Sequence, residues 1–230
     1  GVASTTLHVP RCTALHASTL ERPLETVGEQ HGEGAGKRHV SSKFPTANQL
    51  QPQAMPQLRR QTCEAVREGR VRVLDLCAGA GGWHVAATRC GWDVVLSVDI
   101  CSSVQKYHGI NHGTPFLVGD LQKPETVDRI CNLAPPGLEV ITASPPCTPF
   151  SSAGVHRKGD PRAQVAVACA RVACKLLPLA FVLENTSHFC PSTANPVWTT
   201  TIQPMLIAAG YTITVVKSCL SRLGIPSSRK

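Results

Sequence analysis

The chain has 230 residues, of which 42% are hydrophobic and 17% charged, which is enough for one domain with a sizeable core. No apolar run is long enough to span a bilayer, and the N-terminus lacks the charged-then-apolar layout of a signal peptide. We therefore expect no membrane partner and a soluble, intracellular protein, nuclear in a eukaryote and cytoplasmic in a bacterium or virus. The net charge of +8 favours an anionic partner, with nucleic acid first.

Residues 1–60 differ in composition from the rest of the chain. They are rich in Thr, Ser, Gln, Pro, Gly and His and show no apolar periodicity. Such a segment buries too little apolar surface to offset its ordering entropy, which predicts a disordered or low-complexity leader. The folded part is expected over residues 61–230, with a short helix at 57–69 that Gly69 ends.

From Arg70 onward, apolar strand-like runs alternate with helical ones. The alternation predicts an α/β fold with a mostly parallel sheet and helices on both faces. Ligands bind beyond the carboxyl ends of the strands in such sheets, so the chemistry should lie just after each strand. The strands are predicted at 71–76, 93–99, 115–120, 138–144, 179–185 and 211–220, and the helices at 82–91, 102–110, 124–134, 161–178 and 196–210.

The first three strand ends suit an adenosine ligand. A glycine cluster at 79–82 follows the first strand and lets the backbone come close to a ligand. Asp99 ends the second strand, where an acid can bond ribose hydroxyls, and Asp120 ends the third, where a carboxylate can accept from an adenine amino group. A dinucleotide fingerprint would continue with glycine at position 84, but this chain has His84, so NAD is disfavoured.

The next two strand ends carry a thiol and a carboxyl group. Cys147 follows Pro145 and Pro146, which stiffen the backbone that holds it. Glu184 ends the fifth strand. If these two strands are neighbours, the thiol and the carboxyl group share one rim of the sheet, as a nucleophile and a proton donor would.

The chain has 11 cysteines, and most should be small, buried, reduced hydrophobes. None of them forms a CxxC pair, and no His/Cys cluster has the spacing of zinc ligands. The sequence therefore predicts no metal site.

The motifs DLCAGAGGW, SVD, VGDL, SPPCTPFS, VLENTSHF and SRLGIPSSRK occur in this order between residues 71 and 230. Together they resemble the cytosine-C5 DNA methyltransferases. The resemblance implies a Rossmann-like, S-adenosylmethionine-dependent methyltransferase fold. It also implies that Cys147 adds to C6 of a cytosine flipped out of the DNA duplex, so that C5 can take a methyl group from S-adenosylmethionine.

The resemblance also assigns roles to individual residues. Glu184 would protonate or hydrogen-bond N3 of the cytosine, and Asn185 would brace the loop that carries Pro146 and Cys147. Arg229 would contact the cytosine and lower the pKa of the thiol. The cofactor-binding residues implied are Asp75, Leu76, Cys77, Ala78, Gly79, Gly81, Gly82, Asp99, Ile100, Asp120 and Leu121.

The chain departs from the family pattern at several positions. Cys77 stands where the family has phenylalanine, Asp99 where it has glutamate, Thr148 where it has glutamine, and the segment 142–144 replaces a glycine-rich lead-in. In the family, an antiparallel strand and a target-recognition region follow the arginine motif. We therefore expect a C-terminally truncated catalytic core, whose last strand is missing and whose strand at 211–220 is an exposed edge.

Two alternatives to a DNA methyltransferase stay open at this point. One is an RNA methyltransferase of the tRNA type with the same chemistry. The other is a truncated, inactive remnant that only binds nucleic acid or cofactor. The sequence indicates no oligomeric state.

Overall fold

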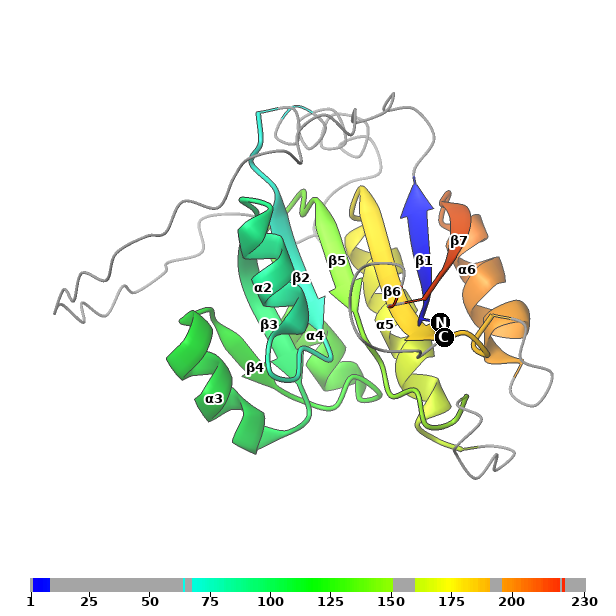
Figure 1. Ribbon diagram of the computed structural model, residues 1–230, viewed down its shortest axis with the longest axis horizontal. Helices are drawn as coiled ribbons and strands as arrows, with labels where there is room; N and C mark the ends of the chain where they lie inside the picture. The colour runs from blue at the N-terminus through cyan, green and yellow to red at the C-terminus, as the bar shows by residue number, and fades with distance from the viewer. Residues whose placement is uncertain are drawn as a thin grey trace, which may run out of the picture.

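The fold is built around one sheet, which the computed structural model describes over residues 2–8, 64, 68–150, 160–190, 196–219 and 221. Its strands are β1 (Val2–His8), β2 (Arg72–Leu76), β3 (Asp93–Asp99), β4 (Phe116–Val118), β5 (Val140–Ala143), β6 (Ala180–Thr186) and β7 (Thr212–Ser218). They lie in the order β4-β3-β2-β5-β6-β1-β7 (Figure 1). Neighbours from β4 to β6 are parallel, whereas β1 is antiparallel to both β6 and β7.

Helices cover both faces of this sheet (Figure 1). They are α2 (Gly82–Arg89), α3 (Ser102–His112), α4 (Pro124–Leu133), α5 (Ala163–Leu176), the π-helix η4 (Trp198–Ile202) and α6 (Gln203–Ala208). The α/β order predicted from Arg70 onward is confirmed, because apolar runs form the central strands and amphipathic runs form the helices. The helix predicted at 57–69 lies mostly outside the described residues.

Strand β1 was not anticipated from the sequence. It occupies the place between β6 and β7, so the prediction that the last strand is missing is corrected, and so is the prediction of disorder for residues 2–8. Val2 lies opposite Thr186 and Ser218, and His8 lies opposite Ala180 and Thr212. The segment VASTTLH is rich in β-branched residues, and β6 and β7 both offer it a free edge. A composition averaged over residues 1–60 conceals this short run.

Strand β7 forms one edge of the sheet, as predicted for residues 211–220. It pairs with β1, and Val215 and Val216 on it are exposed. An exposed apolar edge can pair with another chain.

Two clusters of buried side chains hold the helices to the sheet. The larger one joins the central strands to α4, α5 and α6, and Leu74, Ile141 and Phe181 are fully buried in it. The smaller one packs Ala87 of α2 against Val73 and neighbouring strand residues. Each fully buried side chain of this size stabilises the fold by roughly 1.5–3 kcal/mol, so the strands form a rigid base for the loops at their ends. No helix within the described ranges is long and apolar enough to cross a membrane.

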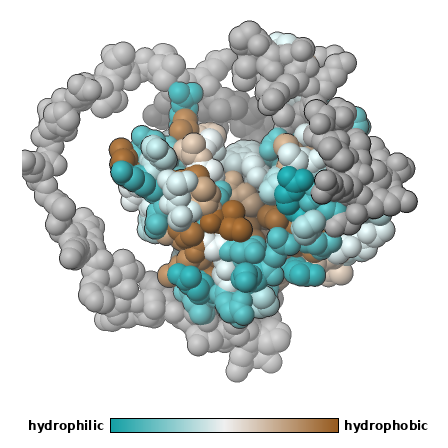
Figure 2. Space-filling view, turned by 90° about the horizontal axis from the view of Figure 1, so that it is seen from below, coloured by the Kyte–Doolittle hydropathy of each residue, from teal (hydrophilic) through white to brown (hydrophobic). Residues whose placement is uncertain are grey.

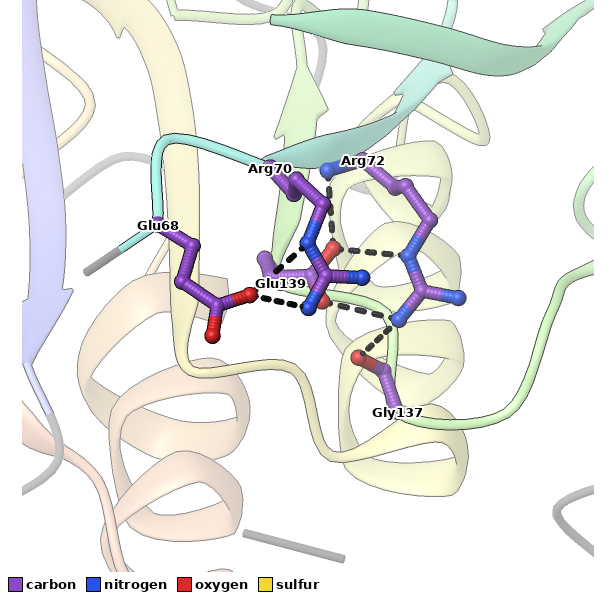
Figure 3. Close-up of polar contacts among 5 residues, drawn as sticks. All are labelled: Glu68, Arg70, Arg72, Gly137 and Glu139. Carbon is purple, nitrogen blue, oxygen red and sulfur yellow. Dashed lines mark hydrogen bonds and ion pairs between the residues drawn. The ribbon is translucent and has the colours of Figure 1, made fainter. Parts of the chain in front are cut away.

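An ion pair joins the amino ends of β2 and β5 (Figure 3). Glu139 is fully buried, and its carboxylate accepts from the Arg72 backbone N–H at 2.7 Å, from Nε at 2.9 Å and from Nη2 at 2.8 Å. The same Nη2 donates to the Gly137 carbonyl at 2.7 Å. A second pair, Arg70 with Glu68, lies nearby but is exposed. A buried carboxylate is costly unless it is paired, so Arg72 and Glu139 fix how these two strands align.

Candidate active site

The candidate site lies at the carboxyl ends of the parallel strands. Strand β2 has β3 on one side and β5 on the other, so the later strands are added first on one side of β2 and then on the other. Open α/β sheets bind ligands at such a switch point. Figure 2 looks onto this end of the sheet, where apolar residues gather near the middle and polar residues lie around them. The glycine loop after β2 and the loop after β5, which carries Pro146 and Cys147, both leave the sheet at this end.

The glycine loop after β2 is held in place by Asp99 at the end of β3. One carboxylate oxygen of Asp99 accepts from the Gly79 N–H at 3.0 Å, and the other accepts from the Cys101 N–H at 2.9 Å. Gly79 and Gly81 have φ values of 52° and 95°, a region that favours glycine. The Ala78 N–H donates to the Val98 carbonyl at 3.0 Å. Loop and acid therefore form one hydrogen-bonded unit, and Asp99 has lone pairs left for a ligand.

Asp75 lies beneath this loop as a buried acid. Thr142 donates a hydrogen bond to its Oδ1 at 3.0 Å, whereas Oδ2 is buried without a hydrogen-bond partner among the described residues. Burial raises the pKa of Asp75 to about 7. The hydrogen bond from Thr142 lowers this pKa in part, and the charge of Asp99 raises it by a smaller amount. A buried carboxylate oxygen with spare capacity is a group that a cationic ligand could satisfy.

Three histidines that the sequence analysis did not single out as a group pack behind the glycine loop. The rings of His84 and His112 have centroids 4.2 Å apart, and those of His108 and His112 are 4.7 Å apart. Burial and the neighbouring His112 lower the pKa of both His84 and His108. The His112 Nε2 lies 3.1 Å from the Ala80 carbonyl, so the cluster contacts the loop directly. Histidines scattered over two helices give no signal in the sequence.

We expect Gly81→Ala to distort the loop and weaken cofactor binding. A Cβ at this position would lie 2.2 Å from the His112 Nε2, and the φ of Gly81 is strained for alanine. The expected cost is about 2 kcal/mol of stability, with a loss of at least tenfold in S-adenosylhomocysteine affinity measured by calorimetry.

Gly91→Ala is the matched control, because Gly91 also has a positive φ but a Cβ there meets nothing within 4 Å, and Gly91 lies beyond the far end of α2. Equal behaviour of the two variants would contradict the role of His112 in shaping the loop.

The other predicted cofactor residues lie along the same rim. Asp120 accepts from the Gln122 N–H at 2.9 Å and so stabilises the turn after β4. Ile100 is 66% exposed directly after β3, where its side chain is free to cover a ligand. Leu121, like Leu76 and Ala78, is buried and supports the loops from below.

Cys77, which stands in place of the family's phenylalanine, has a left-handed backbone with φ of 56°. Its Sγ lies 4.0 Å from the Sγ of Cys169 on α5. The contact with Cys77 and burial both raise the pKa of the Cys169 thiol. Left-handed non-glycine residues are uncommon and concentrate at functional sites.

The loop after β5 carries the predicted nucleophile. Cys147 is exposed and not part of a disulfide, and its carbonyl accepts from the Phe150 N–H at 2.9 Å in a turn. The side-chain amide of Asn185 donates to the Pro145 carbonyl at 3.2 Å and ties this loop to β6. Phe150 is fully buried and anchors the far side of the turn. The sulfur is therefore presented on a loop fixed at both ends.

Glu184 lies on β6, the neighbour of β5, and the pairing of Ala143 with Leu183 brings Ser144 beside it. Burial raises the pKa of Glu184, and a hydrogen bond with the Ser144 side chain partly lowers it. The indole N–H of Trp83, at the start of α2, donates to the Ser144 Oγ at 2.7 Å. The sequence analysis noted residue 144 only as a departure from a glycine-rich pattern and did not use Trp83. Arg229 lies outside the described residues.

No group of His, Cys, Asp and Glu in the described part of the chain has an arrangement that could hold a metal ion. The polar groups of the rim are carboxylates, hydroxyls and backbone amides around one thiol. They suit an organic ligand with a cationic end and hydroxyl groups.

The fold belongs to the Rossmann-like α/β class of methyltransferases. A crystal structure of the S. pombe Dnmt2 methyltransferase superposes with a TM-score of 0.54 at 24% identity, covering 70% of this chain and 46% of that one. The family model of the C-5 cytosine-specific DNA methylases matches residues 71–230, and the chain belongs to this family.

Curated relatives agree with this family. The chain is similar to the type II methyltransferase M.HindV of Haemophilus influenzae, with 27% identity over 69% of this chain and 50% of the relative. It is also similar to M.SsoII of Shigella sonnei, with 30% identity over 70% of this chain and 41% of the relative. The chain thus spans about half the length of the curated relatives it matches.

Proposed function

We propose that this chain carries the catalytic centre of a DNA cytosine-C5 methyltransferase that works through a covalent adduct between Cys147 and cytosine C6. The observation that carries the proposal is the attachment of the Cys147 loop to the strand of Glu184, through the Asn185 amide and the Pro145 carbonyl at 3.2 Å. The net charge of +8 and the family membership support DNA as the substrate.

The Cys147 sulfur forms a bond to C6, while Glu184 gives its proton to N3 and becomes a carboxylate. This addition makes C5 electron-rich, so that C5 could take the methyl group that bound S-adenosylmethionine would supply from its sulfonium, leaving a neutral thioether. A base then removes the proton from C5, and the Cys147–C6 bond breaks with its electron pair returning to the sulfur. N3 gives its proton back to Glu184, which restores the aromatic ring and the acid. The target base must leave the stack for C6 to be reached, so the exposed position of Cys147 suits a flipped cytosine.

S-adenosylmethionine supplies the methyl group, and the residues of the glycine loop fit it. The unpartnered Oδ2 of Asp75 would accept from its α-ammonium group, and Asp99 would accept from the ribose hydroxyls. Ile100, Asp120 and Leu121 would bound the adenine, and the backbone from Leu76 to Gly82 would hold the methionine end.

Two measurements test the proposal. DNA in which every cytosine is 5-fluorocytosine should form a denaturation-resistant adduct with the protein in the presence of S-adenosylmethionine, because fluorine blocks the final proton removal. Methyl transfer from labelled S-adenosylmethionine should go to duplex DNA in preference to tRNA. Adduct and transfer only with tRNA would support the RNA alternative, and binding of cofactor without either would support an inactive remnant.

Binding of S-adenosylhomocysteine should depend on the ionisation of Asp75. The pKa of Asp75 is about 7, so the carboxylate that accepts from the α-ammonium is present above this pH and is lost as the pH falls. Affinity should then weaken by about tenfold for each pH unit below 7 and level off above it. Calorimetry between pH 5 and 8 measures the dependence.

Asp75→Asn should bind weakly and lose most of this pH dependence, whereas Asp128→Asn, a change in an exposed pair with Lys175, should keep it. If the affinity of Asp75→Asn for S-adenosylhomocysteine still falls with pH as in the wild type, the titrating group is another one, such as a member of the histidine cluster.

A further inference from the structure

The hydrogen bonds that meet at Ser144 connect the cofactor loop with the proposed proton donor. Trp83 lies at the start of α2, directly after the glycine loop. Ser144 directly follows β5, and Glu184 lies on the adjacent strand β6. A hydrogen bond joins Trp83 to Ser144, and the register of β5 with β6 places Ser144 beside Glu184. A glycine at position 144, as in the family pattern, could not accept this bond.

The direction of these contacts follows from the chemistry of the groups. An indole N–H is a donor only, so the Ser144 Oγ must be the acceptor of the 2.7 Å contact with Trp83. The hydroxyl proton of Ser144 is then free to point elsewhere. Its hydrogen bond with Glu184 lowers the pKa of that carboxyl group, which is the effect of a donor on the ionised form.

We propose that Trp83 and Ser144 form a hydrogen-bonded relay that orients the Glu184 carboxyl group and stabilises its ionised form. The proposal rests on the role of Glu184 in the proposed function. Ser144 and Trp83 are positioning residues here, since they act on the substrate through Glu184.

The relay has a use in the addition step. Glu184 is half-buried on β6, and burial raises its pKa, so it tends to hold its proton. When the proton passes to N3 of the cytosine, a carboxylate is left in surroundings that disfavour charge. The Ser144 hydroxyl, polarised by the indole N–H of Trp83, would stabilise that carboxylate as it forms. Strands β5 and β1 flank β6. The titratable groups that they bring are Cys147, in the loop after β5, and His8, which lies opposite Ala180 at the far end of β6.

The test is a direct titration of Glu184 by NMR of ¹³C-labelled glutamate carboxyl groups, with the signal assigned through Glu184→Gln. Ser144→Ala should raise the pKa of Glu184 by about one unit, because a hydrogen bond to the ionised form is lost. Trp83→Phe should raise it by a smaller amount, since the Ser144 hydroxyl remains. Ser144→Thr, which keeps a hydroxyl group, should restore the wild-type titration.

Trp92→Phe is the matched control for the tryptophan, since Trp92 packs against the smaller core cluster away from Ser144. A pKa of Glu184 that is the same in Ser144→Ala as in the wild type would overturn the relay. The titration needs no turnover, so this result is distinguishable from failure of the proposed function.

Where turnover is present, its pH profile gives a second reading. A proton donor with a higher pKa holds its proton to higher pH, so the alkaline limb of kcat should move upward by the same shift in Ser144→Ala. A purely structural role of Ser144 would lower kcat at all pH values without moving the limb, which would contradict the relay.

Discussion

Replacing Cys147 by alanine should abolish methyl transfer to DNA while leaving the cofactor site intact. The thiol forms the bond to C6 on which every later step depends, so we expect a loss of at least about 10⁴-fold in kcat. Cys147 is exposed on its loop, and alanine removes no core contact, so the free energy of unfolding should change by less than about 0.5 kcal/mol. Transfer of labelled methyl groups to DNA measures the loss of activity. Calorimetry with S-adenosylhomocysteine checks that the cofactor site is intact.

Cys90 offers a matched control, since it is also exposed and not part of a disulfide but lies at the end of α2, on another part of the molecule. Cys90→Ala should transfer methyl groups and form the 5-fluorocytosine adduct as the wild type does. An adduct that persists in Cys147→Ala would assign the nucleophile to another residue and overturn the mechanism.

The largest effect on stability is expected from Arg72→Ala. The change leaves the fully buried Glu139 carboxylate without the guanidinium that neutralises it, and only the backbone N–H of residue 72 still bonds it. Breaking a buried pair on one side typically costs about 3–5 kcal/mol, and we expect a value near the lower end because the Arg72 side chain is 34% exposed. Urea denaturation at pH 7 measures the change.

The neighbouring pair provides the comparison (Figure 3). Arg70 and Glu68 have side chains that are 71% and 60% exposed, so Arg70→Ala should cost less than about 1 kcal/mol. An equal loss of unfolding free energy in Arg72→Ala and Arg70→Ala would mean that the pairing of Glu139 does not stabilise the junction of β2 and β5.

The central sheet could be predicted from the sequence, and so could the place of the candidate site residues at its rim, because each depends on local pattern. Apolar runs such as 93–99 become strands wherever both faces are covered, and β3 has these same bounds in the structure. Asp99 ends β3, Glu184 lies near the end of β6 and Cys147 follows β5. The topology then brings these strand ends together at one rim.

The features that were missed depend on contacts between distant segments. The contact of Trp83 with Ser144 joins the start of α2 to the loop after β5, and the histidine cluster joins two helices. The pairing of β1 with β6 and β7 is set by edges that exist only in the folded sheet. Periodicity and spacing describe one segment at a time, so they carry no information on such contacts.

The position of β1 also has a consequence for the time course of folding. This strand precedes the other strands of the sheet along the chain, yet its partners are the two strands furthest from it in sequence: His8 pairs with Ala180 of β6 and with Thr212 of β7. Contacts between residues so far apart are slow to form, because the loop entropy must be overcome before they contribute. We infer that β2 to β6 assemble first and that β1 and β7 join in a late step, during which the free edge of β6 is open to pairing with other chains.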